Sequence, residues 1–151
     1  SNYKLQKNTC GSEIDIVARK PLQQINLDYP HGTGHGVGYF LNVHEGPQAI
    51  SRGNKIKFKE GMIVSNEPGY YENGKFGIRI ENLIRVKKIK NSYKFVDLTL
   101  VPIDKSLIQK ELLNQKEIEW LNSYHSKVYF NLKKYMNKTE LAELKNSCSN
   151  I

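Results

Sequence analysis

The chain has 151 residues, of which 38% are hydrophobic and 25% charged, and it carries a formal net charge of +8. A chain of this length can bury one modest core, and it holds no uninterrupted apolar stretch as long as a membrane span requires. The basic clusters at 52–59 and 85–94 show neither a nucleic-acid-binding motif nor interleaved stacking aromatics. We therefore expect no nucleic-acid partner and no membrane association. Cys10 and Cys148 lie far apart in the sequence without metal-binding spacing and are expected to be free thiols.

Residues 14–25 are expected to form the first helix. Apolar residues recur there at helical spacing, and Ser12 with Asp15 resembles a capping box. Pro21 lacks the N–H that a helix interior needs, so it should kink or shorten the helix. Residues 30–47 differ, because alternating glycines at their start would be costly in a helix. This stretch is expected to be a strand or loop whose backbone passes close to another group.

Two strands are expected next along the chain. The first is a short apolar run at 62–64 that closes in a turn at Glu67. The second, at 78–86, places alternate side chains on opposite faces. The glycine-rich stretch between them would let the strands run antiparallel, which would bring Glu67 and Glu81 close together. A further strand is expected at 94–100.

Beyond Pro102 the pattern becomes helical. Asp104 is expected to cap a helix over 105–113, and longer and shorter helices are expected at about 114–136 and at 137–144. The longer helix carries a narrow apolar seam suited to packing along another helix. The seam consists of Ile118, Leu121, His125, Val128, Leu132 and Tyr135.

The histidines of the glycine-rich stretch suggest two familiar motifs that do not fit. His31 and His35 have the spacing with which a helix binds zinc in metalloproteases. The glycines argue against a helix, and Gly32 stands where the H-E-x-x-H signature requires Glu. The dinucleotide-binding pattern G-x-G-x-x-G also fails, because Val37 or Tyr39 occupies its last glycine position.

The remaining candidates are His31, His35 and His44, followed by Glu67 and Glu81 on strands expected to be adjacent. One imidazole with two carboxylates forms a largely hard ligand set that suits Mn²⁺, Co²⁺ or Zn²⁺. Taken singly, each Glu is more often a surface residue and each His more often a hydrogen-bonded structural one. Glu81 is the most unusual, because apolar residues flank it and a central carboxylate in such a strand needs a cation or donor.

Four blocks of sequence resemble those of the aminopeptidase P family and follow the order of that family. They are HGTGHGVG at 31–38, FLNVHEGP at 40–47, NEPGYY at 66–71 and GIRIEN at 77–82. Each block alone would be weak, but together they are highly specific. Segments 98–103 and 120–125 are similar to the C-terminal part of the long cytosolic eukaryotic form of this family.

The resemblance implies an α+β chain of two parts. Residues 1–103 would form the C-terminal half of a pita-bread catalytic domain, and residues 104–151 a helical C-terminal extension. The implied activity is that of a metal-dependent aminopeptidase that releases the N-terminal residue from peptides with proline in second position. Its implied cofactors are two divalent ions, with Mn²⁺ the first choice, which activate a water for hydrolysis. The resemblance also implies that the full-length enzyme is a homodimer and is located in the cytoplasm.

The matching blocks also imply a role for each site residue. His35, Glu67 and Glu81 would be metal ligands, with Glu81 bridging both ions. Glu67 would also act as general base for the attacking water. His31 and His44 would contact the peptide substrate and stabilise charge on the scissile carbonyl oxygen. The residues expected to line or support the site are Tyr71 and Arg79.

Upstream of His31 the chain departs from the family pattern. The family supplies two further Asp ligands there, whereas only Asp15 and Asp28 precede His31, and Asp15 falls in the expected helix. We therefore expect an incomplete piece of the enzyme that is inactive by itself. Two alternatives stay open: a non-catalytic pita-bread protein that binds a peptide or partner, and a nucleic-acid-binding module suggested only by the net charge.

Overall fold

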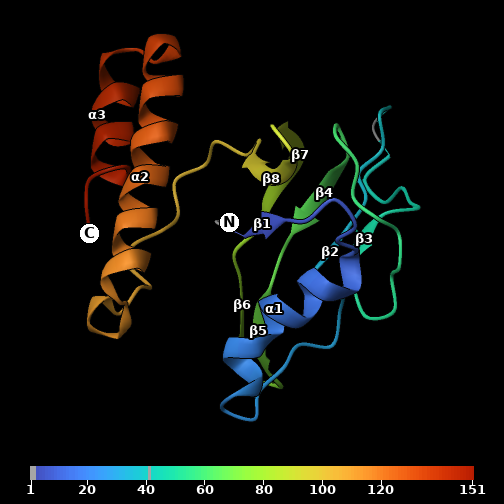
Figure 1. The fold of residues 1–151 in the computed structure, drawn as a ribbon. Helices are drawn as coiled ribbons and strands as arrows, with labels where there is room; N and C mark the ends of the chain where they lie inside the picture. Colours follow the sequence, from blue (N-terminus) through green and yellow to red (C-terminus); the bar gives the residue numbers. More distant parts are fainter. Residues whose placement is uncertain (1–2, 41) are drawn as a thin grey trace. The chain divides into compact units, whose positions relative to one another are not determined.

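The structure, a computed structural model, describes residues 3–40 and 42–151. It divides into two compact units, Ser1–Thr99 and Leu100–Ile151 (Figure 1). The first unit carries the described strands and one long helix, and the second carries two further helices, which confirms the predicted α+β class. The predicted boundary between 103 and 104 stays a prediction. Leu41, part of the FLNVHEGP block, lies outside the described residues.

The first unit is built on a four-stranded antiparallel sheet. Its strands, in spatial order, are β1 (Lys4–Leu5), β8 (Ser92–Asp97), β7 (Asn82–Ile89) and β4 (Ile63–Asn66). Alternate residues of these strands face a core, as the period of two in a strand requires. The buried core residues are Leu5, Ile14, Ile50, Phe58, Val64, Ile84, Val86 and Phe95.

Two short antiparallel ribbons complete the strands of this unit. Strand β2 (Gly34–His35) pairs with β3 (Ala49–Ile50), and β5 (Gly69–Glu72) pairs with β6 (Phe76–Arg79). The single strand predicted at 78–86 is therefore wrong. The predicted strand is interrupted between β6 and β7. Arg79 pairs with Gly69 in the ribbon, whereas Asn82 pairs with Asn66 in the main sheet.

Helix α1 (Gly11–Gln23) begins earlier than predicted. Its cap is Cys10, whose N–H donates to the Glu13 carboxylate at 2.7 Å, so the predicted cap formed by Ser12 and Asp15 is wrong. Asp15 is instead buried on the inner face of the helix. Pro21 lies inside the helix, in its last turn, and the helix ends two residues later at Gln23, so a shortening by Pro21 stays a prediction.

The helix predicted at 105–113 does not form. This stretch holds only a single 3₁₀ turn, η1 (Lys110–Leu112), and the Asp104 carboxylate accepts the Ser106 N–H at 2.9 Å in a local turn. A short helix needs a packed apolar face, but Leu107 and Leu112 are each 76% exposed.

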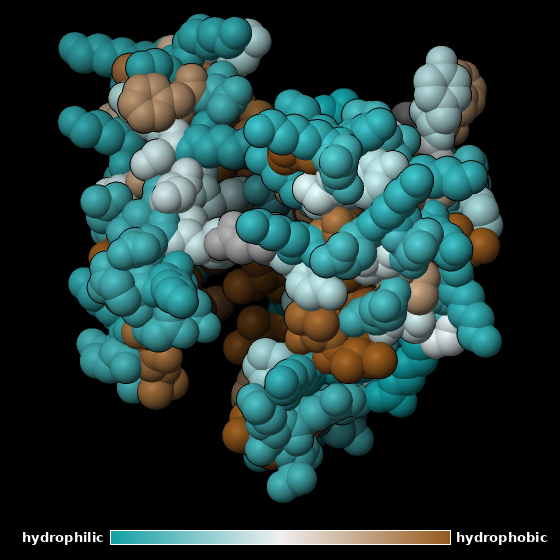
Figure 2. All heavy atoms as spheres, viewed as in Figure 1, coloured by the Kyte–Doolittle hydropathy of each residue, from teal (hydrophilic) through white to brown (hydrophobic). Residues whose placement is uncertain are grey.

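The other two predicted helices form with strong caps. Helix α2 (Gln115–Leu132) continues into the 3₁₀ turn η2 (Lys133–Tyr135), and α3 (Lys138–Ser147) begins at the predicted Asn137 capping box. Val128 of the predicted seam lies in a buried cluster with Tyr124, Leu144 and Cys148, and Leu132 packs against this cluster, whereas Tyr135 is 70% exposed. None of the described helices is both long enough and apolar enough to span a membrane. Hydrophilic side chains predominate on the face shown in Figure 2.

Candidate metal centre

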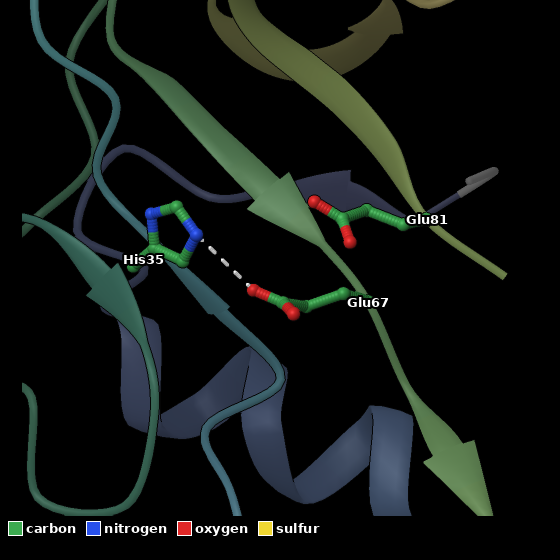
Figure 3. A group of neighbouring side chains, drawn as sticks. All are labelled: His35, Glu67 and Glu81. Carbon is green, nitrogen blue, oxygen red and sulfur yellow. Dashed lines mark ion pairs between the residues drawn. The ribbon is translucent and has the colours of Figure 1, made fainter. Parts of the chain in front are cut away.

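Three predicted ligands come together in the first unit. His35, Glu67 and Glu81 each offer a donor atom, and these atoms lie within 4.8 Å of one another (Figure 3). His35 ends β2, Glu67 directly follows β4 and Glu81 directly precedes β7. The pairing of Asn66 with Asn82 places the two glutamates side by side. Within 3–40 and 42–151, no other such group of three His, Cys, Asp or Glu donors is found.

The His35 ring is oriented as a ligand. Its Nδ1 lies 3.0 Å from the Gly36 carbonyl oxygen, which can only accept, so Nδ1 carries the proton. In the neutral ring with this tautomer, Nε2 presents its lone pair toward Glu67 Oε1, 3.3 Å away. An imidazole lone pair and a carboxylate oxygen aimed at one point repel unless a cation or proton lies between them. A backbone contact that fixes the tautomer is typical of metal-ligating histidines, so this donor set fits a divalent cation.

Ser65 holds two of the candidate ligands and was missed by the sequence analysis. It is fully buried, accepts the His35 N–H at 2.9 Å and donates its hydroxyl to Glu67 Oε1 at 2.9 Å. β2 can approach this strand because Gly34 has no side chain: a Cβ there would lie 1.9 Å from the Ser65 carbonyl oxygen. Ser65 lies just beyond the strand predicted at 62–64, and nothing in its spacing distinguishes it in the sequence.

The second oxygen of Glu67 begins a chain of contacts that reaches His31. Arg79 Nη1 donates to Glu67 Oε2 at 3.2 Å, and Arg79 Nε donates to the Tyr71 hydroxyl at 2.8 Å. The Tyr71 hydroxyl is also 2.8 Å from His31 Nε2. Because His31 Nδ1 donates to the Gly32 carbonyl at 2.8 Å, the Tyr71 hydroxyl is the donor to Nε2. The hydrogen bond to Tyr71 is the main cause of the raised pKa of Arg79.

Two of the predicted site residues, His44 and Glu81, have exposed side chains. The His44 ring centroid lies 4.0 Å from that of His35, and the His44 side chain is exposed. Glu81 is also exposed, although we expected a carboxylate central to an apolar strand. The reason is the break between β6 and β7, where Ile78 and Ile80 are each 47% exposed.

The two upstream aspartates are already engaged. Asp15 and Asp28 both accept hydrogen bonds from Arg19, at 2.9 and 2.6 Å. The Arg19 guanidinium lowers the pKa of Asp28 to about 2. Neither belongs to the donor group formed by His35, Glu67 and Glu81.

An α+β chain that aims one imidazole and two carboxylates at a common point has the features of a metal-binding hydrolase. Comparison with known families gives a matching result. Residues 3–88 match metallopeptidase family M24, and residues 91–151 match the C-terminal region of peptidase M24. The chain belongs to the metallopeptidase family M24, which confirms the resemblance inferred from the motifs.

Relatives of the chain include proteins named as probable Xaa-Pro aminopeptidases. The chain is 51% identical to a probable Xaa-Pro aminopeptidase P of Tuber melanosporum, over 90% of this chain and 24% of the relative. A probable Xaa-Pro aminopeptidase P of Botryotinia fuckeliana is 47% identical over 89% of this chain and 22% of its own length. The chain thus spans about a quarter of the length of these relatives.

Solved structures show the same relationship. X-prolyl aminopeptidase from Caenorhabditis elegans, described as a cytosolic enzyme with a dinuclear active site, matches with a TM-score of 0.89 and 39% identity. That match covers 99% of this chain and 26% of the other. X-Pro aminopeptidase from Thermotoga maritima matches with a TM-score of 0.51 and 36% identity, over 60% of this chain and 25% of the other. The fold is that of the C-terminal half of a pita-bread domain, as predicted.

Proposed function

We propose that the full-length protein carrying this chain is a metal-dependent aminopeptidase that releases the N-terminal residue from peptides with proline in second position. The observation that carries the proposal is the convergence of His35, Glu67 and Glu81 in a chain of the M24 family. The names of its relatives support the preference for proline.

The proposed cofactors are two divalent cations, with Mn²⁺ the first candidate. His35 would bind through Nε2, Glu67 through its carboxylate, and Glu81 would bridge both ions. When bound, the ions supply Lewis-acid activation of water and of the scissile carbonyl. One imidazole and two carboxylates are ligands that Mn²⁺ accepts.

The side chains of the site have separate proposed roles. Glu67 accepts the proton of the attacking water, and Ser65 and Arg79 hold one carboxylate oxygen each. His44 is exposed beside His35 and can donate a ring N–H toward the developing charge on the carbonyl oxygen. His31 is proposed to contact the same oxygen, which requires a proton on Nε2, the nitrogen that accepts the Tyr71 hydroxyl in this structure. Tyr71 and Arg79 support this arrangement.

Glu81→Ala in the full-length protein tests the proposal. We expect turnover of a Xaa-Pro peptide to fall by at least about 10³-fold, as when several kcal/mol of transition-state stabilisation is lost. Bound metal, measured by mass spectrometry, should fall as well, because a bridging carboxylate contacts both ions. Glu72→Ala is the matched control, since Glu72 pairs with Lys75 on the neighbouring ribbon. Two bound equivalents of metal with normal hydrolysis in Glu81→Ala would overturn the proposal.

We also propose that the full-length protein is a cytoplasmic homodimer. The C. elegans enzyme is described as cytosolic, and the described helices include no candidate membrane span. Cell fractionation followed by immunoblotting tests the location, and recovery of the protein in a membrane or secreted fraction would contradict it.

A further inference from the structure

Helix α1 buries an ion pair that the proposed reaction does not use. Asp15 and Arg19 are one helical turn apart, so they share a face, and they are only 1% and 3% exposed. Removing two charges from water is costly, and replacing a buried pair with apolar residues is often neutral or stabilising. Stability alone therefore gives little reason for this pair.

The hydrogen bonds of Arg19 lead to the backbone that carries His31. Its Nε donates to Asp15 at 2.9 Å, and its Nη1 donates to Asp28 at 2.6 Å and to the Tyr29 carbonyl at 2.8 Å. Its Nη2 donates to the His31 carbonyl itself. The guanidinium carbon also lies 4.0 Å from the centre of the Tyr29 ring. Arg19 thus fixes the chain both before His31 and at His31.

Asp15 holds the same loop at a second point. Its Oδ1 accepts the Thr33 hydroxyl at 2.6 Å. Because this contact uses the single hydroxyl proton of Thr33, the Tyr29 hydroxyl is the donor to Thr33 Oγ1. The Thr33 carbonyl in turn accepts the Glu67 N–H at 2.8 Å. The pair on α1 therefore contacts the backbone of His31 directly and reaches the backbone of Glu67 through Thr33.

We propose that Asp15 and Arg19 form a helix clamp that sets the position of His31 relative to Glu67, and that both are positioning residues for the reaction. Their burial keeps them from touching substrate, and they reach the site through the backbone of 29–33. The proposal rests on the proposed aminopeptidase function, because it assigns His31 a contact with the reacting carbonyl oxygen.

Arg19→Lys in the full-length protein is the first test. Lysine keeps the charge but has one nitrogen, so it cannot bond Asp15 and the carbonyls of 29 and 31 with the geometry of a guanidinium. A misplaced His31 should lower kcat by about 10- to 100-fold with KM changed by less than about threefold. Arg52→Lys is the control, because Arg52 also pairs with Asp28 but its side chain is 69% exposed.

A double-mutant cycle separates positioning from simple destabilisation. If the clamp acts through His31, Arg19→Lys should change kcat by less than about threefold in a His31→Ala background. A clamp with only a structural role would lower activity by the same factor in both backgrounds, and that result would overturn the proposal. Metal content is measured in all four proteins and should not differ between Arg19→Lys and wild type.

A milder pair of substitutions covers the case in which Arg19→Lys does not fold. Thr33→Val removes the hydroxyl that Asp15 accepts while keeping the side-chain shape, and Thr33→Ser restores that hydroxyl. We expect kcat to fall in Thr33→Val and to recover to within about threefold in Thr33→Ser. Equal kcat in both variants would overturn the clamp. A wild-type protein without Xaa-Pro turnover would instead overturn the proposed function, so the two failures are distinguishable.

Discussion

At the scale of single residues, the oxygen of Tyr71 connects the two sides of the candidate site. It accepts from Arg79 Nε and donates to His31 Nε2, each at 2.8 Å. Arg79 also donates to Glu67, the proposed general base. One hydroxyl therefore fixes the ring of His31 and the guanidinium that orients Glu67.

Tyr71→Phe should show the value of that hydroxyl. Its loss leaves His31 Nε2 and Arg79 Nε without their present partner, so we expect kcat to fall by about 10- to 100-fold with metal content unchanged. The control is Tyr70→Phe, because the Tyr70 hydroxyl donates to Glu72 on the ribbon and not to the site. Steady-state kinetics on a Xaa-Pro peptide measure kcat in both variants. Equal kcat in both variants would contradict the role given to Tyr71.

The ligands and their supports differ in how far the sequence could predict them. Spacing left His35, Glu67 and Glu81 as candidates among other readings, and their assignment came from the resemblance to a family. Ser65 and Arg19 were missed because a serine in a strand and an arginine in a helix have no distinctive spacing. Their importance comes from contacts that only the fold creates, across 30 residues for Ser65 with His35 and 12 for Arg19 with His31.

At the scale of elements, the alternation of apolar residues predicted that strands form, but it did not predict where each strand begins and ends. The strand at 62–64 and the antiparallel relation of 67 and 81 follow from local pattern and are found in β4 and β7. The break between β6 and β7 was not predictable, because residues on both sides keep the same alternation. The failed helix at 105–113 has a cap and helix-forming residues but lacks buried apolar contacts.

Helix α2 contains a buried titratable group that should make stability depend on pH. His125 is fully buried, and its Nε2 accepts the Ile103 N–H at 3.1 Å, so this nitrogen is unprotonated. Burial, and then the charge of Lys105, lowers the pKa of His125 below its ordinary value of 6.5. The unfolded state therefore binds the proton more readily. The stability that His125 contributes is complete above pH 6.5 and is lost as pH falls below it.

Thermal unfolding between pH 7.5 and pH 5.5 tests this prediction. The wild type should lose more stability on acidification than His125→Gln, which cannot titrate, and each unit of pKa difference corresponds to about 1.4 kcal/mol. Comparing the two proteins cancels the contribution of the other histidines. The same pH dependence in both would show that His125 is not a source of acid sensitivity.

At the scale of the whole molecule, the chain consists of two units with different contents. The first holds the candidate metal centre, and the second holds two packed helices and no residue of that centre among those described. The second unit nevertheless leaves several large apolar side chains exposed on the described chain. They are Leu107, Leu112, Phe130 and Tyr135, each at least 63% exposed. Exposed apolar side chains are candidates for an interface where they adjoin one another.

The proposed homodimer assigns that interface to a second copy of the full-length protein. Symmetric twofold dimers are the commonest assemblies of soluble proteins, and in such a dimer the same residues of the two copies can meet. Truncation after Ile103 should then convert the dimer to a monomer and halve the mass measured by light scattering. Phe130→Glu should weaken the dimer in the same direction, whereas Asn131→Glu, at the next exposed position of α2, should leave it intact. A protein that is monomeric both with and without residues 104–151 would contradict the role of this unit in assembly.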